Sequence, residues 1–147
     1  MPGERFVLDA SIALEWFLPG GGAGARYAEA ILERVSSGEL VPSVPDLWHT
    51  EIASVLIAAK RSRRISAAKL RSSQLSIRGL HMETLAIELD AAELIDLSQR
   101  YHLQGYDTVY FETARRLAIP IASIDGGIKT ACRVFGVKLL EPGNLKE

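Results

Sequence analysis

The sequence predicts an α/β fold in which a central, mainly parallel sheet lies between two layers of helices. Short apolar runs of β type alternate with longer segments that have helical periodicity, and this alternation is typical of parallel sheets covered on both faces. The first apolar run ends at Asp9 and a later one ends at Asp125, each directly before an expected helix. The length of 147 residues favours one compact domain over residues 1–147.

The elements follow from local patterns along the chain. Strands are expected at 6–8, 40–42, 84–89, 120–124 and 137–140. Helices are expected at 11–18, 27–35, 46–60, 66–80, 90–101, 107–117 and 126–135. Ser66 is the expected N-cap of its helix, and Asp90 with Glu93 resembles a capping box. Gly136 is expected to close the last helix, and Gly20–Gly24 to form a flexible link too short to separate domains.

Composition excludes several classes of protein. Hydrophobic residues make up 48% and charged residues 24%, which is ordinary for a globular chain and argues against disorder. The single cysteine, Cys132, can form neither an intrachain disulfide nor a cysteine-based zinc site. No apolar run approaches the ~18 residues that a membrane span needs, and the N-terminus lacks the pattern of a signal peptide. We therefore expect a cytoplasmic protein.

Charge is balanced overall but uneven along the chain. The net charge of −1 argues against a strongly basic nucleic-acid binder. Between Ile52 and Met82, however, the sequence has no acidic residue and these basic ones: Lys60, Arg61, Arg63, Arg64, Lys69, Arg71 and Arg78. This segment is either a solvated helix face or a basic rim that attracts a polyanion, and the sequence leaves both open.

Two aspartates stand where ligands bind in open α/β sheets, beyond the carboxyl ends of strands. If their strands are parallel, Asp9 and Asp125 lie on the same edge of the sheet. Each also precedes a helix, so an N-cap role explains each of them equally well when taken alone.

Two further carboxylates fall on helix faces that look buried. Asp107 shares a stripe with Phe111 and Ala114, although it also stands at a helix start. Glu51 is aligned with Leu47 and Val55, and a carboxylate on an apolar stripe is costly to bury unless it is paired or binds a metal. The alternative is that Glu51 lies at the margin of the stripe, where it reaches solvent or pairs with an arginine.

Together, Asp9, Glu51, Asp107 and Asp125 predict a metal site. Carboxylates forced close together repel, and a divalent cation relieves that repulsion. Ligands made only of oxygen favour hard ions, so Mg²⁺ or Mn²⁺ is the expected cofactor. Such a cage suits the hydrolysis of phosphodiesters. Ser11 and Ser123 could orient these ligands or contact phosphate, although helix capping and a strand-end hydroxyl explain them as well.

Four segments that contain these acids resemble PIN-domain endoribonucleases, and above all the VapC-type toxins of toxin–antitoxin pairs. The segments are Val7–Ser11, Leu47–Ala53, Gly105–Tyr110 and Ile121–Asp125. Their order and spacing extend over nearly the whole chain. Gly126–Gly127 departs from the family, which often has a basic residue directly after the last acid.

The resemblance implies a PIN-like three-layer α/β/α fold and a ribonuclease that depends on Mg²⁺ or Mn²⁺. It also implies a homodimer, an RNA substrate and a cognate antitoxin that occupies the acidic groove. By this match Asp9, Glu51, Asp107 and Asp125 are the catalytic and metal-binding residues. Lys60, Arg61, Arg63 and Arg64 are candidates for steering RNA toward them.

Two other functions remain open at this point: a housekeeping RNA-processing nuclease of the same chemistry, and an inactive binding module. The three histidines share no ligand spacing and are interpreted as structural, and Tyr110 is expected in the core.

Overall fold

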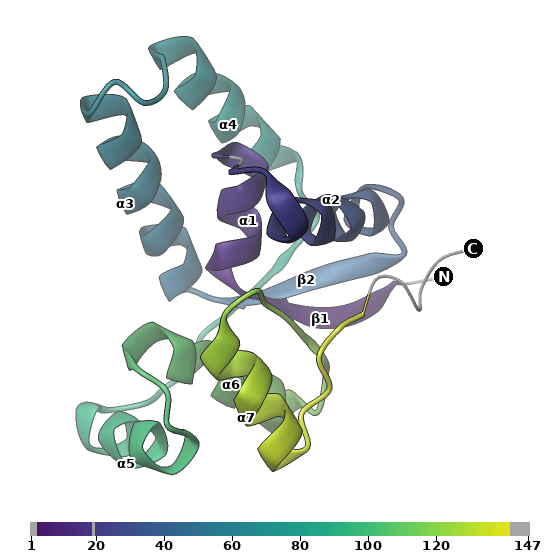
Figure 1. Cartoon of the computed structure of the whole chain (residues 1–147), viewed down its shortest axis with the longest axis vertical. Helices are drawn as coiled ribbons and strands as arrows, with labels where there is room; N and C mark the ends of the chain where they lie inside the picture. The colour runs from purple at the N-terminus through teal and green to yellow at the C-terminus, as the bar shows by residue number, and fades with distance from the viewer. Residues whose placement is uncertain (1–2, 19, 142–147) are drawn as a thin grey trace.

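The computed structural model describes residues 3–18 and 20–141, in which helices and strands alternate as expected (Figure 1). The strands are β1 (Glu4–Leu8), β2 (Leu40–Pro45), β3 (Glu83–Leu85) and β4 (Ile121–Ala122). The helices are α1 (Ala10–Phe17), α2 (Gly22–Ser36), α3 (Leu47–Arg61), α4 (Ala67–Gly79), α5 (Ala91–Tyr101), α6 (Gly105–Leu117) and α7 (Gly126–Phe135).

The sheet has the order β3-β2-β1-β4, and every pairing in it is parallel. Strand β1 pairs with β2 from Glu4 opposite Leu40, and with β4 through Val7 opposite Ile121. All four strands therefore end at the same edge of the sheet, where β1 leads into Asp9 and β4 into Ser123.

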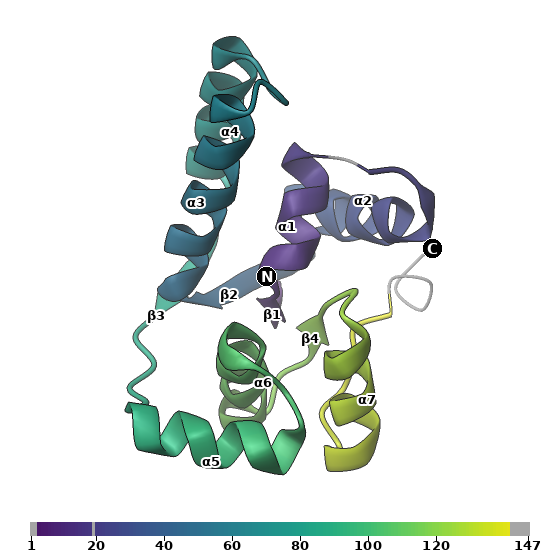
Figure 2. The same cartoon turned by 60° about the vertical axis from the view of Figure 1, so that its left-hand side comes forward.

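Helices cover both faces of the sheet. Figures 1 and 2 show α1 and α2 on one side and α6 and α7 on the other. Helix α6 packs against β1, β2 and β4. Helices α3 and α4 pack against each other and form a hairpin that projects beyond the sheet (Figure 2). The α/β fold with a parallel sheet between helical layers is confirmed.

The hydrophobic core lies between β1 and the helices that cover the two faces of the sheet. Phe6, Val7 and Leu8 of β1 are fully buried, as are Trp48 on α3 and Phe111 on α6. Because side chains alternate between the two faces of a strand, β1 can bury residues against both helical layers. No helix in residues 3–18 and 20–141 combines the length and the apolar character needed to cross a membrane.

Several local expectations are confirmed. Ser66 accepts a hydrogen bond from the Lys69 amide, and Gly136 closes α7 with a φ of 76°. Asp90 and Glu93 form a full capping box, in which each side chain accepts a hydrogen bond from the amide of the other. These features depend only on neighbouring residues, which is why the sequence alone could predict them.

Other boundaries were predicted wrongly. Strands β3 and β4 are shorter than 84–89 and 120–124, because β3 pairs with β2 over three residues and β4 pairs with β1 over two. Residues 137–140 form no strand and contribute one bridge, Leu139 to Ile121. Strand β2 continues to Pro45, since a proline removes only one donor from the ladder. Helix α2 begins at Gly22, inside the expected glycine link.

Candidate functional site

Asp9 stands at the N-terminus of α1, but its side chain caps no amide of that helix. Its Oδ2 atom instead accepts hydrogen bonds from Ser11 Oγ at 2.7 Å and from Ser123 Oγ at 2.6 Å. Asp9 is only 4% exposed, and burial raises the pKa of its carboxyl while the two serines lower it. The N-cap explanation therefore does not account for this aspartate, which is held by a serine of α1 and by the serine that follows β4.

Ser123 connects the two strand-end aspartates. It is fully buried, donates to Asp9, and accepts a hydrogen bond from the Asp125 amide at 3.0 Å. Asp125 does cap its helix, because its Oδ2 accepts from the Ile128 amide at 2.9 Å. A Cβ atom at position 127 would lie 3.1 Å from Asp125 Oδ2, so a residue without a side chain suits this turn.

Glu51 lies near the start of α3 and is half-buried. Its Oε1 accepts a hydrogen bond at 2.7 Å from the hydroxyl of Tyr110, which is fully buried on α6. In the described part of the chain no lysine or arginine forms an ion pair with Glu51. The arginine partner considered from the sequence is therefore absent there, and a tyrosine takes its place.

The sequence interpretation assigned Tyr110 to the core, which is correct for its ring but missed its hydroxyl. The available signal was helical spacing: Tyr110 follows Asp107 by three residues and so shares its face of α6. Which residue of α3 it would meet could not be inferred from spacing, because the contact joins residues 59 positions apart.

Asp107, in the first turn of α6, shows that the four carboxylates influence one another. Burial, followed by the charges of Asp125, Asp9 and Glu51 in that order, raises its pKa to about 6. The pKa of Glu51 is raised by burial and by Asp9, against the effect of Tyr110. The fold thus brings together, at the carboxyl ends of β1 and β4, side chains from β1, α3, α6 and the β4–α7 turn.

The donor set of this cluster suits a hard dication, since all of its atoms are carboxylate oxygens whose charges repel. Across residues 3–18 and 20–141, however, no group of three or more His, Cys, Asp or Glu side chains is arranged so that it could hold a metal ion. Binding an ion would therefore require some of these side chains to rotate inward. Such a rotation is opposed by their mutual repulsion and favoured by the charge of the ion.

The four basic residues singled out in the sequence lie apart from this cluster. Lys60 and Arg61 end α3, and Arg63 and Arg64 form the turn before α4, all of them exposed. Arg61 follows Glu51 by ten residues, which is about 15 Å along the helix axis. They occupy the far tip of the α3–α4 hairpin in Figure 1.

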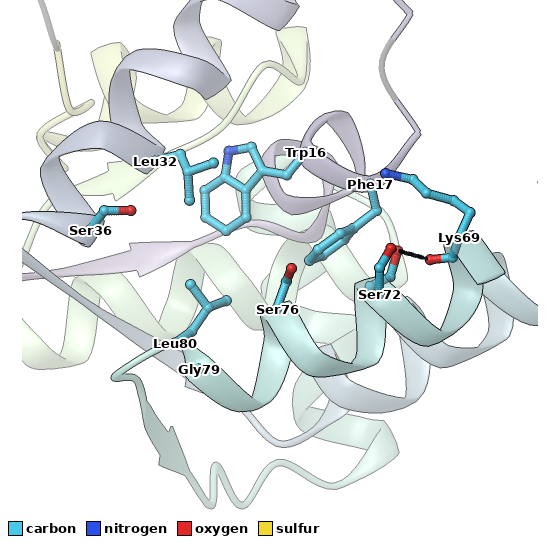
Figure 3. A pocket seen from close by; sticks show the side chains of 10 residues that line it. Trp16, Phe17, Leu32, Ser36, Lys69, Ser72, Ser76, Gly79 and Leu80 are labelled. Atoms are coloured by element: carbon cyan, nitrogen blue, oxygen red, sulfur yellow. Dashed lines mark hydrogen bonds between the residues drawn. The ribbon is translucent and has the colours of Figure 1, made fainter.

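A separate cavity of about 360 Å³ lies between α1, α2 and α4 (Figure 3). Trp16 and Phe17 form one wall, and Ser72 and Ser76 of α4, with Leu80 directly after it, line the opposite one. None of the four carboxylates lines it.

Comparison with known proteins establishes the fold. No family model matches the sequence, and no curated protein matches it either. Solved structures do match, and they share the PIN-like three-layer α/β/α arrangement expected from the sequence.

Three of these structures illustrate the likeness. PAE2754 from Pyrobaculum aerophilum is 17% identical with a TM-score of 0.63, covering 99% of this chain and 95% of its own. A toxin–antitoxin complex from Klebsiella pneumoniae is 20% identical with a TM-score of 0.60, covering 93% of this chain and 97% of its own. FitAcB from Neisseria gonorrhoeae is 13% identical with a TM-score of 0.60, covering 95% of this chain and 99% of its own. At these identities the likeness establishes the fold.

Proposed function

We propose that this chain is an endoribonuclease dependent on Mg²⁺ or Mn²⁺ and the toxin of a toxin–antitoxin pair. The observation that carries the proposal is Asp9, a buried carboxylate that caps no helix amide, is held by two serines and lies among three other carboxylates. The fold supports it, since one of the similar structures is a toxin–antitoxin complex. The sequence segments that resemble VapC-type toxins contain the same acids.

The residues of the cluster have separable tasks in this proposal. Asp9, Glu51, Asp107 and Asp125 would hold the ion, which when bound supplies an activated water and offsets charge on the phosphate. Ser11 and Ser123 fix the Oδ2 atom of Asp9 and so orient its carboxylate. The N-termini of α1 and α7 follow Asp9 and Asp125 at this edge, and their positive dipole ends would favour an incoming phosphate.

The test is cleavage of RNA in Mg²⁺ or Mn²⁺ by Asp9→Asn, alone and combined with Glu51→Gln. We expect the rate to fall about 100-fold or more, because a neutral amide neither binds the ion as well nor contributes charge to the cluster. Asp46→Asn is the matched control, since Asp46 is exposed and its side chain caps no amide of α3. Undiminished cleavage by the Asp9 variant would remove the nuclease assignment.

Simple measurements distinguish two rival functions from that of a toxin. An inactive binding module should take up no Mn²⁺ in calorimetric titration, whereas the proposed nuclease should. A housekeeping nuclease should not arrest growth when expressed. For a toxin we expect arrest, relieved by co-expression of an antitoxin encoded beside it. In this proposal the protein acts in the cytoplasm as a homodimer that binds RNA and the antitoxin.

A further inference from the structure

Tyr110 reaches from one helix of the carboxylate cluster to another. It stands on α6 one turn after Asp107, and its hydroxyl donates to Glu51 Oε1 on α3 at 2.7 Å. Among residues 3–18 and 20–141 it is the one residue that donates a hydrogen bond to the Glu51 carboxylate. Helix α6 therefore contributes both a carboxylate to the cluster and the group that restrains a second carboxylate.

This hydrogen bond matters because Glu51 has a choice of positions. Its side chain is half-buried, so rotation toward solvent is open to it. The phenol of Tyr110 is itself fully buried and requires an acceptor there. The pairing satisfies the phenol and keeps Glu51 turned toward the cluster.

We propose that Tyr110 is a positioning residue, which holds Glu51 in the orientation needed to bind the divalent ion. The inference rests on the proposed function, because it assumes that Glu51 is a ligand. The hydrogen bond engages Oε1, so Oε2 would remain available to bind the ion. Groups that orient metal ligands in this way typically change metal affinity by about 10–100-fold when removed.

The chain offers a matched control for the test. Tyr101 is also buried, and its hydroxyl also donates to a glutamate at 2.7 Å, but that glutamate is Glu112, which faces two arginines instead of the cluster. Tyr101→Phe and Tyr110→Phe each remove one hydroxyl and keep the ring. A general loss of packing would affect both variants, whereas loss of Glu51 positioning affects only the second.

The experiment titrates Mn²⁺ into the full-length wild type and both variants by calorimetry. We expect Tyr110→Phe to weaken Mn²⁺ binding about 10-fold or more and Tyr101→Phe to change it less than about twofold. In a Glu51→Gln background, Tyr110→Phe should weaken Mn²⁺ binding further by less than about twofold. Equal Mn²⁺ affinity of the wild type and Tyr110→Phe would overturn the inference. It would also be overturned if Tyr110→Phe weakened Mn²⁺ binding as much in the Glu51→Gln background as it does in the wild type.

A second measurement needs no metal and separates this inference from the proposed function. In the metal-free protein the ¹³C resonance of the Glu51 side-chain carboxyl should shift in Tyr110→Phe and stay in place in Tyr101→Phe. If the wild type binds Mn²⁺ and cleaves RNA but this resonance does not move, the positioning role alone is wrong. If the resonance moves but the wild type neither binds Mn²⁺ nor cleaves RNA, the proposed function is wrong and the metal role of Tyr110 falls with it.

Discussion

Asp107 makes the electrostatic cost of the carboxylate cluster measurable. The unfolded chain releases its proton near pH 3.8, whereas burial and three neighbouring charges hold the pKa of the folded state at about 6. Between these values the folded protein binds more protons than the unfolded chain, so its stability falls as the pH rises through this window and stays lower above it.

We therefore expect Asp107→Asn to stabilise the metal-free protein at about pH 8. Each tenfold change in proton affinity is worth about 1.4 kcal/mol, and Asp107 is only half-buried, so the expected gain is about 1–2 kcal/mol. Denaturant unfolding in a chelator measures it. The gain should vanish below about pH 3.8, where both forms are neutral. A variant that is less stable than wild type at pH 8 would show that the cluster is not under repulsive strain.

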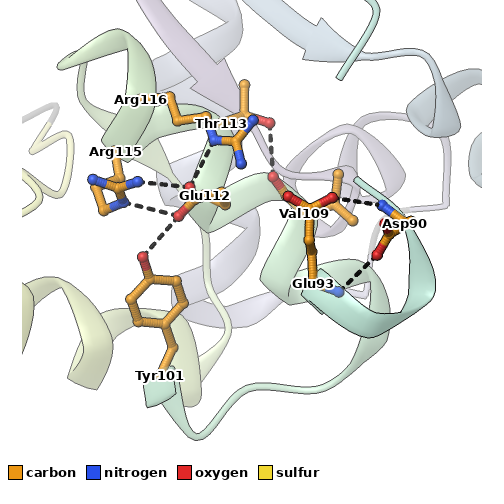
Figure 4. A network of polar contacts seen from close by, with 8 residues as sticks. All are labelled: Asp90, Glu93, Tyr101, Val109, Glu112, Thr113, Arg115 and Arg116. Carbon is orange, nitrogen blue, oxygen red and sulfur yellow. Dashed lines mark hydrogen bonds and ion pairs between the residues drawn. The ribbon is translucent and has the colours of Figure 1, made fainter. Parts of the chain in front are cut away.

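At the scale of elements, a hydrogen bond to Glu112 connects α5 to α6. Its carboxylate is 1% exposed and accepts hydrogen bonds from Tyr101 on α5 and from Arg115 and Arg116 on its own helix (Figure 4). Burial raises its pKa, but the hydrogen bonds from Arg115, Tyr101 and Arg116 outweigh burial and lower it to about 2. The network therefore stabilises the fold wherever Glu112 is ionised, and this stabilisation is lost as the pH falls from about 4.5 toward 2.

We expect Glu112→Gln to lower the free energy of unfolding by about 1–3 kcal/mol near pH 7, because two arginines and a buried phenol lose their ionised acceptor. Both arginines are partly exposed and can turn to water, which keeps the loss below that of a fully buried pair. Glu39→Gln is the control: its pair with Arg34 is 3.5 Å long and half-exposed, so the expected change is near zero. A loss that persists unchanged at about pH 2 would contradict this account.

At the scale of the whole molecule, the basic tip of the α3–α4 hairpin lies far from the acidic cluster. If the protein binds RNA, this separation fits a strand that crosses both, with the phosphates paired at the tip and one of them held at the carboxylates. Charges at such a distance act on binding more than on the chemical step, because their contacts are the same before and during the reaction.

Reversal of Arg61, Arg63 and Arg64 to Glu should therefore weaken RNA binding and reduce the slope of log affinity against log salt by about 2. Fluorescence anisotropy with a labelled single strand measures both quantities. The matched control reverses three exposed arginines elsewhere, Arg26, Arg100 and Arg133, with the same change in net charge. If the two triple variants have equal slopes, the hairpin tip is not part of the RNA interface.

The features predicted well are those whose causes are local. The capping box at Asp90 and the end of α7 at Gly136 depend on residues a few positions apart, and both are confirmed. The short strands were predicted less well. Strands β3 and β4 end where β2 and β1, respectively, stop pairing with them, and those partners lie far away in the sequence.

The sequence by itself predicted that strands and helices alternate, that the sheet is mainly parallel, and that Asp9 and Asp125 follow strands, whose carboxyl ends share an edge if the two strands are parallel. It could not decide between a cap and a site for either residue. Only the tertiary structure shows their hydrogen bonds: Ser123, 114 residues away, and Ser11 both donate to Asp9, which caps no amide of α1, whereas Asp125 also caps α7. Likewise only the packing of α6 on α3 gave Glu51 a tyrosine for a partner. The physical reason is that side-chain hydrogen bonds extend about 3 Å, so partners distant in sequence are chosen by the fold.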